Sequence, residues 1–446
     1  MTITALNLAV VGHTNTGKTS LMRTLLRDVH FGEVKDEAGT TRHVEQATIR
    51  LNHTDLVHLF DTPGLEDATG LLEWLEQNTP ARADGIERLE VFLNSELAQN
   101  DFSQEAKVIR QVLNSNMSIY VIDAREPILA KYKDELTLLS WCARPLMPVF
   151  NFIAKQDLLE WSDMLARRGL HVHVGFDTVA FDFEGEMRLW DNLSTMLPNR
   201  GVTDELIRIR REEWQQLDHD ARLKIADMLL DVAAYQSEIA EEADPAPALA
   251  QMHSTVKQLE RQMHEQLLHL YRFYDSDVAP TELNLQEFQQ DPFDTEVLKQ
   301  YGIRTTSGAA AGALIGLGFD AATAGTSLGM GAAIGGLIGG ILSNASTISD
   351  KLQGIQTIHV DPATITLLAT RGLDLLDAIQ HRGHATQSNT ITVTERQAPF
   401  KPHQLPAPLK KARTRANWSS ANGKSVEQAR AARAEAAEEL AKELKR

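Results

Sequence analysis

The feature that most constrains this chain is the segment GHTNTGKT at residues 12–19, which directly follows the apolar run Leu6–Val11. Its two glycines allow backbone conformations that turn N–H groups inward, and a helix predicted over Ser20–Leu26 adds the positive end of its dipole. Lys18 supplies a point charge for β- and γ-phosphates, and the Thr19 hydroxyl is a ligand for Mg²⁺. The segment therefore predicts a triphosphate cradle, formed by Gly12, Asn15, Thr16, Gly17, Lys18, Thr19 and Ser20.

Short β-rich apolar runs alternate with helical stretches over residues 3–200. This alternation predicts an α/β fold, with a mostly parallel sheet and helices on both faces. Between the third and fourth runs, Leu71–Asn114 predicts an inserted helical pair. At 446 residues the chain is also too long for one core, so we assign residues 1–200 to a first domain. The predicted strands are Leu6–Val11, Val44–Leu51, Leu56–Phe60, Ser118–Ile122, Met147–Ile153 and Leu170–Val174.

A second motif, Asp61-Thr62-Pro63-Gly64, ends the third apolar run. Asp61 at this position can hold Mg²⁺ through water, and the Gly64 amide can contact a γ-phosphate. The segment Gly39–Arg42 lies between the two motifs, and Thr41 is the threonine expected to close on Mg²⁺ and the γ-phosphate. Alone D-x-x-G is a weak signal, but the combination predicts two switch segments.

The segments GHTNTGKTSL, GTTRHV and DTPG resemble the Era-like and TrmE-like P-loop GTPases of the translation-factor superclass, over about residues 5–200. The remainder resembles a group of uncharacterised bacterial GTPases with a C-terminal domain of unknown function. The resemblance implies hydrolysis of GTP to GDP with Mg²⁺, and Lys18, Thr41 and Asn15 as catalytic residues. In the TrmE-like branch the position of Asn15 helps coordinate K⁺, so the resemblance implies that ion as well.

The residue after DTPG is Leu65, which stands where Ras-like enzymes have their water-orienting glutamine. An apolar side chain cannot orient water by hydrogen bonding. We therefore expect hydrolysis to depend on K⁺, on dimerisation of the GTPase domains, or on a partner.

The resemblance departs at the guanine motif, because relatives have Asn-Lys-x-Asp at the end of the fifth strand. Here PVFNFIAKQD, residues 148–157, aligns Ala154-Lys155-Gln156-Asp157 with it. Asp157 would accept from the two guanine N–H donors that adenine lacks, and Lys155 would lie over the base. The asparagine amide that braces this loop to the P-loop is missing in this alignment, which leaves guanine selectivity open. The next family motif is expected near Phe176–Ala180, without a clear Ser-Ala-Lys.

Residues 201–307 form a predicted helical domain. One helix is expected over Asp204–Glu242, and a second follows the prolines at 245 and 247. Its apolar residues from Leu249 to Tyr274 repeat every three or four positions and so share one stripe. The two long helices are expected to pack as a hairpin or to associate between copies of the chain.

Residues 308–342 contain one charge, Asp320, and two series of glycines spaced four apart. This spacing is typical of a glycine-zipper hydrophobic hairpin, in which helix backbones approach closely. Two interpretations stay open: insertion into a membrane, which the length of Ala321–Leu342 permits, or burial within the protein, since the segment is only mildly apolar.

Residues 343–395 form a predicted helical C-terminal part around Leu367–Ile379, with a short polar strand at Asn389–Gln397. Residues 396–446 are expected to be a basic flexible tail with a terminal helix, since residues 401–446 hold eleven Lys or Arg against five Glu in a chain of net charge −17. Such a tail either solubilises the protein or binds anionic lipid or RNA.

Residues 1–12 lack the basic region and cleavage site of a secretory signal and are expected to form a first strand, and the single cysteine, Cys142, excludes an intrachain disulfide. We therefore expect a GTPase switch in the cytoplasm, associated with or inserted into the inner membrane. Its expected partners are guanine nucleotide, membrane lipid through residues 308–342 and the tail, and a second copy of the chain. The alternatives are an Era-like GTPase acting in ribosome assembly or RNA binding, and a membrane scaffold that binds GTP with little turnover.

Overall fold

The computed structural model describes residues 4–27, 44–51, 54–153, 156–176, 178, 183–240, 242–271, 290–303, 315–317, 355–380, 398–423 and 429–445. These residues form two compact units, the first ending at Glu213 and the second beginning at Trp214. The boundary lies within one helix, α8 Gly201–Ala234.

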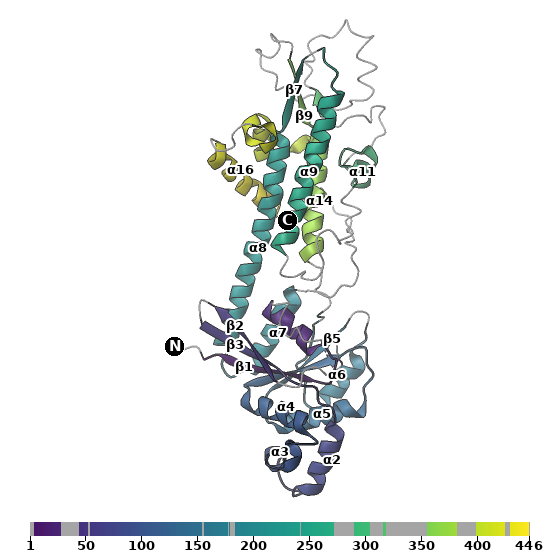
Figure 1. Ribbon diagram of the computed structural model, residues 1–446, viewed down its shortest axis with the longest axis vertical. Helices are drawn as coiled ribbons and strands as arrows, with labels where there is room; N and C mark the ends of the chain where they lie inside the picture. Colours follow the sequence, from purple (N-terminus) through teal and green to yellow (C-terminus); the bar gives the residue numbers. More distant parts are fainter. Residues whose placement is uncertain are drawn as a thin grey trace. The chain divides into compact units, whose positions relative to one another are not determined.

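The first unit is built on a six-stranded sheet in the order β2-β3-β1-β4-β5-β6 (Figure 1). The outermost strand β2 is antiparallel to β3, and the other pairs are parallel. The predicted α/β fold with a mostly parallel sheet is therefore confirmed, although the last strand is shorter and later than Leu170–Val174. The strands are β1 Leu6–Gly12, β2 Glu45–Leu51, β3 Thr54–Asp61, β4 Met117–Asp123, β5 Leu146–Asn151 and β6 Val174–Gly175.

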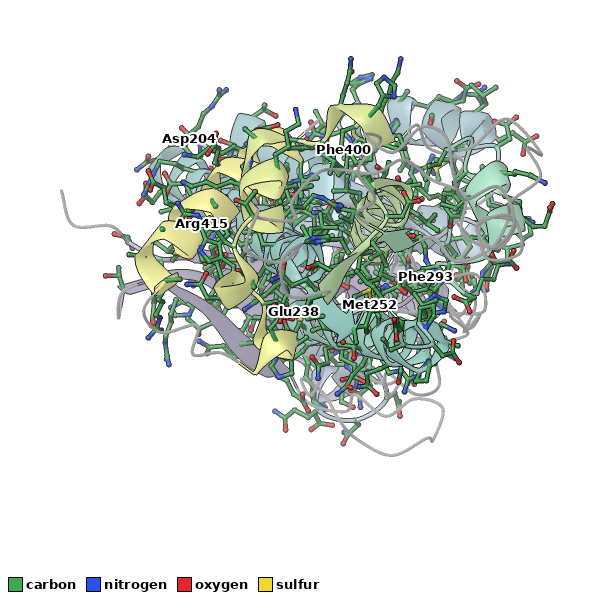
Figure 2. The ribbon with its side chains drawn as sticks, turned by 90° about the horizontal axis from the view of Figure 1, so that it is seen from above. Asp204, Glu238, Met252, Phe293, Phe400 and Arg415 are labelled. Carbon is green, nitrogen blue, oxygen red and sulfur yellow. The ribbon has the colours of Figure 1, made fainter. Side chains whose placement is uncertain are left out.

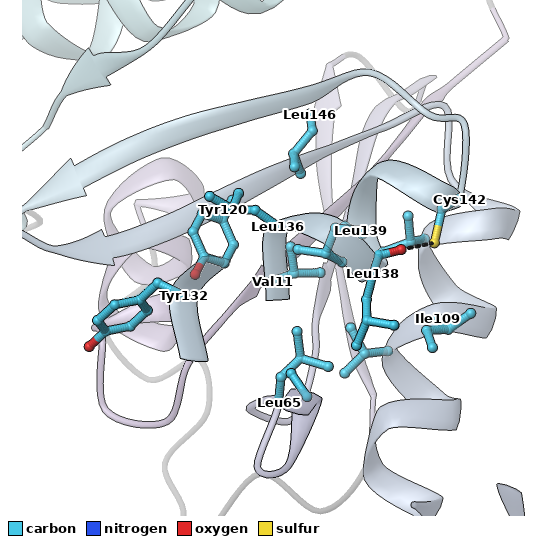
Figure 3. Packing of buried hydrophobic residues seen from close by; sticks show 14 of the residues in the cluster. Val11, Leu65, Ile109, Tyr120, Tyr132, Leu136, Leu138, Leu139, Cys142 and Leu146 are labelled. Atoms are coloured by element: carbon cyan, nitrogen blue, oxygen red, sulfur yellow. Dashed lines mark hydrogen bonds between the residues drawn. The ribbon is translucent and has the colours of Figure 1, made fainter. Parts of the chain in front are cut away.

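Helices cover both faces of this sheet, because its central strands are buried on both sides. Val11 and Ala9 belong to a core shared with α2 to α6, in which Leu65 and Leu136 are also buried (Figure 3). The helices of the unit are α1 Lys18–Leu26, α2 Ala68–Asn78, α3 Gly85–Leu93, α4 Ser103–Asn114, α5 Ala130–Trp141, α6 Leu159–Ala166 and α7 Phe183–Met196.

The segment after the third strand contains three α-helices where a helical pair was predicted. The reason is local: the Asp84 carboxylate accepts from the Glu87 amide, and the Glu87 side chain accepts from the Asp84 amide. This capping box starts α3 as a helix separate from α2.

The second unit contains the C-terminal part of α8 together with α9 Ala246–Leu270 and α14 Pro362–Gln380. On the predicted stripe of α9 the best-buried residues are Met252, Val256, Met263 and Leu267. Gly372 of α14 lies where a Cβ atom would come within 3.2 Å of Ile225 on α8 and 3.3 Å of Met263 on α9. The helices therefore pack closely around a position that favours glycine.

The helix predicted to reach Glu242 ends at Ala234, so that prediction is wrong for its last residues. Gln236–Ala240 is instead the strand β7, paired antiparallel with β9 Ile355–Val360. The pairing partner lies more than a hundred residues along the chain, which a local helical pattern cannot reveal.

The third strand of this small sheet is β8 Ile315–Leu317, which pairs with β9. The helical glycine-zipper prediction is therefore wrong for these three residues, whose backbone hydrogen bonds go to a strand. The rest of residues 308–342 lies outside the described residues, as does the predicted strand Asn389–Gln397. Within the part of the chain that the structure describes, we find no helix that is both long and apolar enough to cross a membrane.

Residues 398–423 fold into short helices, contrary to the prediction of a flexible stretch. Trp418 is fully buried, and the Asp231 carboxylate of α8 accepts from the hydroxyls of Ser419 and Ser420 at 2.8 and 2.9 Å. Apolar residues of this basic segment, such as Trp418, are thus buried by packing within the second unit. The elements are η3 Pro402–Gln404, α15 Ala407–Arg413, η4 Ala416–Trp418, η5 Ser420–Asn422 and, as predicted for the terminus, the helix α16 Arg430–Glu443.

Figure 2 draws the side chains, with Met252 of α9 and Phe293 among those labelled. The His253 ring of α9 stacks on Phe293, with ring centroids 3.8 Å apart, just before the short helix α11 Thr295–Gln300. Within the helical core, the Arg371 guanidinium lies 3.1 Å from the buried Glu260 carboxylate. Burial raises the pKa of Glu260 to about 7, and Arg371 opposes that rise.

Candidate nucleotide-binding site

The loop between β1 and α1 has a backbone that needs glycine at two positions. Gly12 has φ of +145°, and a Cβ atom there would lie 2.5 Å from the Val121 carbonyl oxygen. Gly17 has φ of +88°, and its Cβ would lie 2.2 Å from Nδ2 of Asn151. Asn15, between them, is exposed and also left-handed, with φ of +66°. The strand, loop and helix thus have the backbone shape expected of a phosphate cradle.

Lys18 is buried at the start of α1, with its ammonium group turned back along the loop. Its Nζ donates to the carbonyl oxygens of Gly12 at 3.2 Å and His13 at 2.7 Å. Burial lowers the pKa of Lys18 to about 8, although Asp61 and Glu135 act in the opposite direction. Burial makes the charged form of this ammonium group unfavourable, so an anionic ligand beside it would stabilise the charge.

Thr19 and Asp61 join the two predicted motifs directly, since the Thr19 hydroxyl donates to Oδ2 of Asp61 at 2.7 Å. Oδ1 of Asp61 is buried and has no hydrogen-bond partner among the described residues. Burial raises the pKa of Asp61, and the Thr19 bond and Lys18 oppose that rise. A hydroxyl and an underused carboxylate oxygen are the hard donors that Mg²⁺ prefers, so these residues fit the implied ion.

The end of the D-x-x-G segment packs tightly on the loop. A Cβ atom at Gly64 would lie 2.3 Å from the Thr14 hydroxyl, so this close approach excludes a larger residue. The next side chain, Leu65, is buried in the core below the sheet (Figure 3). Leu65 therefore serves packing, which agrees with its inability to orient water.

A buried carboxylate supports the loop from the side. Glu135 of α5 accepts from the Tyr120 hydroxyl at 2.6 Å and lies 2.8 Å from Nδ1 of His13. The two bonds connect the second residue of the loop to β4 and α5. No sequence pattern indicates this contact, because the three residues are far apart along the chain.

Asn151, the last residue of β5, supplies the brace that the sequence alignment found missing. Its Nδ2 donates to the Thr16 carbonyl oxygen at 3.1 Å, and its Oδ1 accepts from the amide and hydroxyl of Thr178, both at 3.0 Å. The prediction of a missing brace is thus wrong, because Asn151, three residues before the aligned motif, makes a bond of this kind. An asparagine directly after the apolar run 147–150 was the available signal.

The next residue, Phe152, is left-handed, with φ of +56°. The Arg125 guanidinium lies over its ring, 3.9 Å from the centroid. Arg125 is in turn held by Asp123 at the end of β4, with its Nε 2.9 Å from one carboxylate oxygen and a terminal nitrogen 2.6 Å from the other. The Phe152 ring lies on the side of the phosphate loop where Gly17 meets Asn151. Neither Phe152 nor Arg125 was predicted from the sequence.

The remaining predicted site residues do not converge in the same way. Asp157 is exposed, and its Oδ1 accepts from the Leu159 amide at 3.0 Å, in the first turn of α6. Ser20 is exposed on α1. Thr41 and Lys155 lie outside the described residues.

The first unit combines a phosphate-binding loop, a carboxylate that can hold magnesium and a mostly parallel sheet. These features define its class, and the first unit is a P-loop GTPase domain. The family model described as 50S ribosome-binding GTPase matches residues 7–152. A second model, described as a domain of unknown function (DUF3482), matches residues 162–442. The chain belongs to this DUF3482 family, in agreement with the predicted resemblance of its C-terminal part.

Two relatives of similar sequence are described as GTPases. The chain is 31% identical to the tRNA modification GTPase MnmE of Nitratiruptor over 220 residues, which are 49% of this chain and 40% of that protein. It is 32% identical to GTPase Der of Treponema pallidum over 114 residues, 25% of this chain and 24% of the relative. The chain thus spans less than half the length of these relatives. A solved structure of Era with MgGDPNP and 16S ribosomal RNA has 17% identity, covers 44% of this chain and 58% of its own, and gives a TM-score of 0.31.

Proposed function

We propose that the chain binds GTP with Mg²⁺ and hydrolyses it to GDP and phosphate as a molecular switch. The observation that carries the proposal is the 2.7 Å bond between Thr19 and Asp61, beside the buried ammonium of Lys18. Residues from both predicted motifs thus meet at one point, with a free carboxylate oxygen for the ion's hydration shell.

The chain's own groups divide the work as follows. Lys18 and the amides of residues 12–19 hold the β- and γ-phosphates, and their charge stabilises the negative charge that develops in the transition state. Thr19 and Asp61 would hold the ion, which would neutralise phosphate charge when bound. Thr41 closes on the γ-phosphate, and Gly64 contacts the same group through its amide.

Phosphate release from GTP tests this proposal, using the full chain with Mg²⁺. Asp61→Asn keeps the size and removes the charge, and should lower the rate at least about ten-fold because one charged ligand partner is lost. Lys133→Ala, a change at an exposed lysine of α5, is the matched control and should not alter the rate. Equal rates in Asp61→Asn and the wild type would contradict the proposed ion site.

We further propose that K⁺ stimulates hydrolysis through Asn15. Its exposed amide, on a left-handed backbone within the phosphate loop, is accessible to an ion beside the phosphates. K⁺ bound there would add positive charge next to the phosphoryl group. Rates in K⁺ buffer should exceed those in Na⁺ buffer for the wild type but not for Asn15→Ala. Equal wild-type rates in the two buffers would remove the K⁺ proposal and leave the GTPase intact.

Association with the inner membrane from the cytoplasm is also proposed, with the sequence of residues 308–342 as its support: one charge in 35 residues. The test is flotation of the full chain with vesicles of mixed anionic and neutral lipid. The double variant Ile334→Asp with Leu337→Asp should lose flotation, because two carboxylates oppose insertion. Flotation by neither protein would favour a segment packed within the protein.

The alternative is an RNA-binding role in ribosome assembly. Because the C-terminal residues are folded, a simple deletion is not a clean test of this role. Arg433 is paired with Asp227 at 2.9 Å, so part of the basic charge is used within the second unit. Deleting residues 398–446 would therefore expose apolar surface as well as remove charge. Lys401→Glu with Lys410→Glu reverses two exposed charges instead, and loss of salt-sensitive RNA binding in that variant would favour the RNA role.

Two further proposals concern association and turnover. A homodimer through the GTPase domains or the long helices predicts a mass that doubles with nucleotide or with concentration in light scattering. A scaffold that binds GTP with little turnover predicts tight binding and phosphate release no faster than that of Lys18→Ala.

A further inference from the structure

The base side of the proposed nucleotide site differs from the phosphate side in having no carboxylate where the relatives place one. Asn151 makes the brace to the phosphate loop that the asparagine of the relatives' Asn-Lys-x-Asp motif is expected to make. Counting from Asn151 rather than from residue 154, Phe152 takes the place of the lysine and Ala154 that of the aspartate. A methyl group cannot accept the guanine N–H donors.

The carboxylate of the Ala154-Lys155-Gln156-Asp157 alignment, Asp157, has another contact in the structure. It stands six residues after Asn151, is exposed, and accepts from the Leu159 amide in the first turn of α6. Such a bond satisfies a free N–H group at a helix start. Asp157 thus lies just before α6, which begins at Leu159.

Where the relatives have a lysine and an aspartate that contact the base, this chain has the flat aromatic ring of Phe152. The Phe152 ring reaches the phosphate loop, since its Cζ atom lies 3.5 Å from where a Cβ of Gly17 would be. Arg125 covers the ring at 3.9 Å and is fixed by two bonds to Asp123. Rings and guanidinium planes bind bases by stacking, which tolerates any base because every base has a π-face.

We propose that Phe152 and Arg125 hold the base of a purine nucleotide by stacking, and that the site therefore discriminates poorly between guanine and adenine. The inference rests on the proposed nucleotide binding and concerns the other end of the same ligand. Strong discrimination arises when the wrong ligand leaves buried polar groups of the site unpaired. The buried carboxylate of Asp123 is already paired with Arg125 through both of its oxygens, so it does not depend on a base for a partner.

The first test is calorimetry of the full wild-type chain with GDP, ADP and IDP in Mg²⁺ buffer. The three affinities should agree within about ten-fold, because none of the bases pairs with a carboxylate. ADP binding weaker than GDP binding by more than about a hundred-fold would overturn the inference. No heat with any of the three would instead refute the proposed nucleotide site itself, so the two failures are distinguishable.

The second test decides between the two alignments. Asp157→Asn should leave the ratio of ADP to GDP dissociation constants unchanged, whereas Ala154→Asp should raise it by about ten-fold or more, by adding the acceptor that guanine requires. Phe152→Ala should weaken both nucleotides by about the same factor. A selective loss of GDP binding in Asp157→Asn, or a ratio unmoved by Ala154→Asp, would contradict the proposal. Thermal unfolding of each variant verifies that it is folded.

Discussion

The phosphate side and the base side of this site are built from the chain in opposite ways. One continuous segment, residues 12–19, forms the proposed phosphate side, and its glycines, lysine and threonine stand at a fixed spacing that the sequence alone reveals. The proposed base side comes from the ends of three parallel strands, through Arg125 after β4, Asn151 at the end of β5 and Thr178 after β6. The difference teaches that a sequence predicts a site well where its chemistry is local, and poorly where the contacts depend on neighbouring strands.

The largest effect is expected on the phosphate side. Lys18→Ala should weaken GDP and GTP binding by about a hundred-fold or more, because a charged donor to phosphate is lost within a buried loop. Calorimetry measures it, with Lys133→Ala as the exposed-lysine control. Undiminished binding would mean that Lys18 does not hold the phosphates of the nucleotide whose base lies at the other side of the site.

A second change tests the junction between the two sides. Gly17→Ala places a Cβ 2.2 Å from Asn151 on a backbone with φ of +88°, and should lower the free energy of unfolding by about 2–3 kcal/mol. Gly169→Ala is the matched control: its φ is +74°, but nothing lies within 4 Å, so only backbone strain of about 1 kcal/mol is expected. Equal losses in urea unfolding would show that the close contact with Asn151 carries no energy.

Asn151→Ala sharpens the comparison from the base side. It leaves the Thr16 carbonyl and both Thr178 donors without their partner, and should lower the free energy of unfolding by about 2 kcal/mol. Nucleotide affinity should fall about ten-fold for guanine and adenine alike, since the brace holds the loop rather than reading the base. Thr178→Val removes only the hydroxyl bond and should cost less than half as much. If the two variants were equivalent in unfolding and in calorimetry, the brace to the phosphate loop would be unimportant.

The smallest expected effect concerns pH. The pKa of Lys18 is about 8 in the folded chain against an ordinary value of 10.5, so between these values the unfolded chain binds more protons. The free energy of unfolding of the nucleotide-free protein should therefore rise from pH 8 to 10.5 through this group, and below pH 8 it gives no further change. Nucleotide binding needs the charged form, so affinity should fall several-fold between pH 8 and 9.

The measurement is calorimetry at pH 8.5 in two buffers of different ionisation enthalpy. Binding should take up protons at this pH and few at pH 6.5, where Lys18 is already charged. Identical heats in both buffers at pH 8.5 would show that the burial of Lys18 does not couple protons to the ligand.

Much of the first unit could be predicted, because alternating apolar runs and the contiguous motifs are local signals. The two long helices and their buried stripe were likewise evident from periodicity. What failed depended on distant partners: Gln236–Ala240 is a strand because β9 pairs with it, and residues 398–423 are ordered because Asp231 and the surface of α8 accept them. Neither partner is visible within a window of neighbouring residues.

The sequence by itself determined the phosphate cradle, because two glycines, a lysine and a threonine at fixed spacing between a strand and a helix leave little freedom of backbone or charge. Only the tertiary structure decided which residue at the end of β5 bonds to the phosphate loop. The hydrogen bond from Asn151 to Thr16 joins residues 135 positions apart, and it exists because parallel strands bring their carboxyl ends to one edge of the sheet.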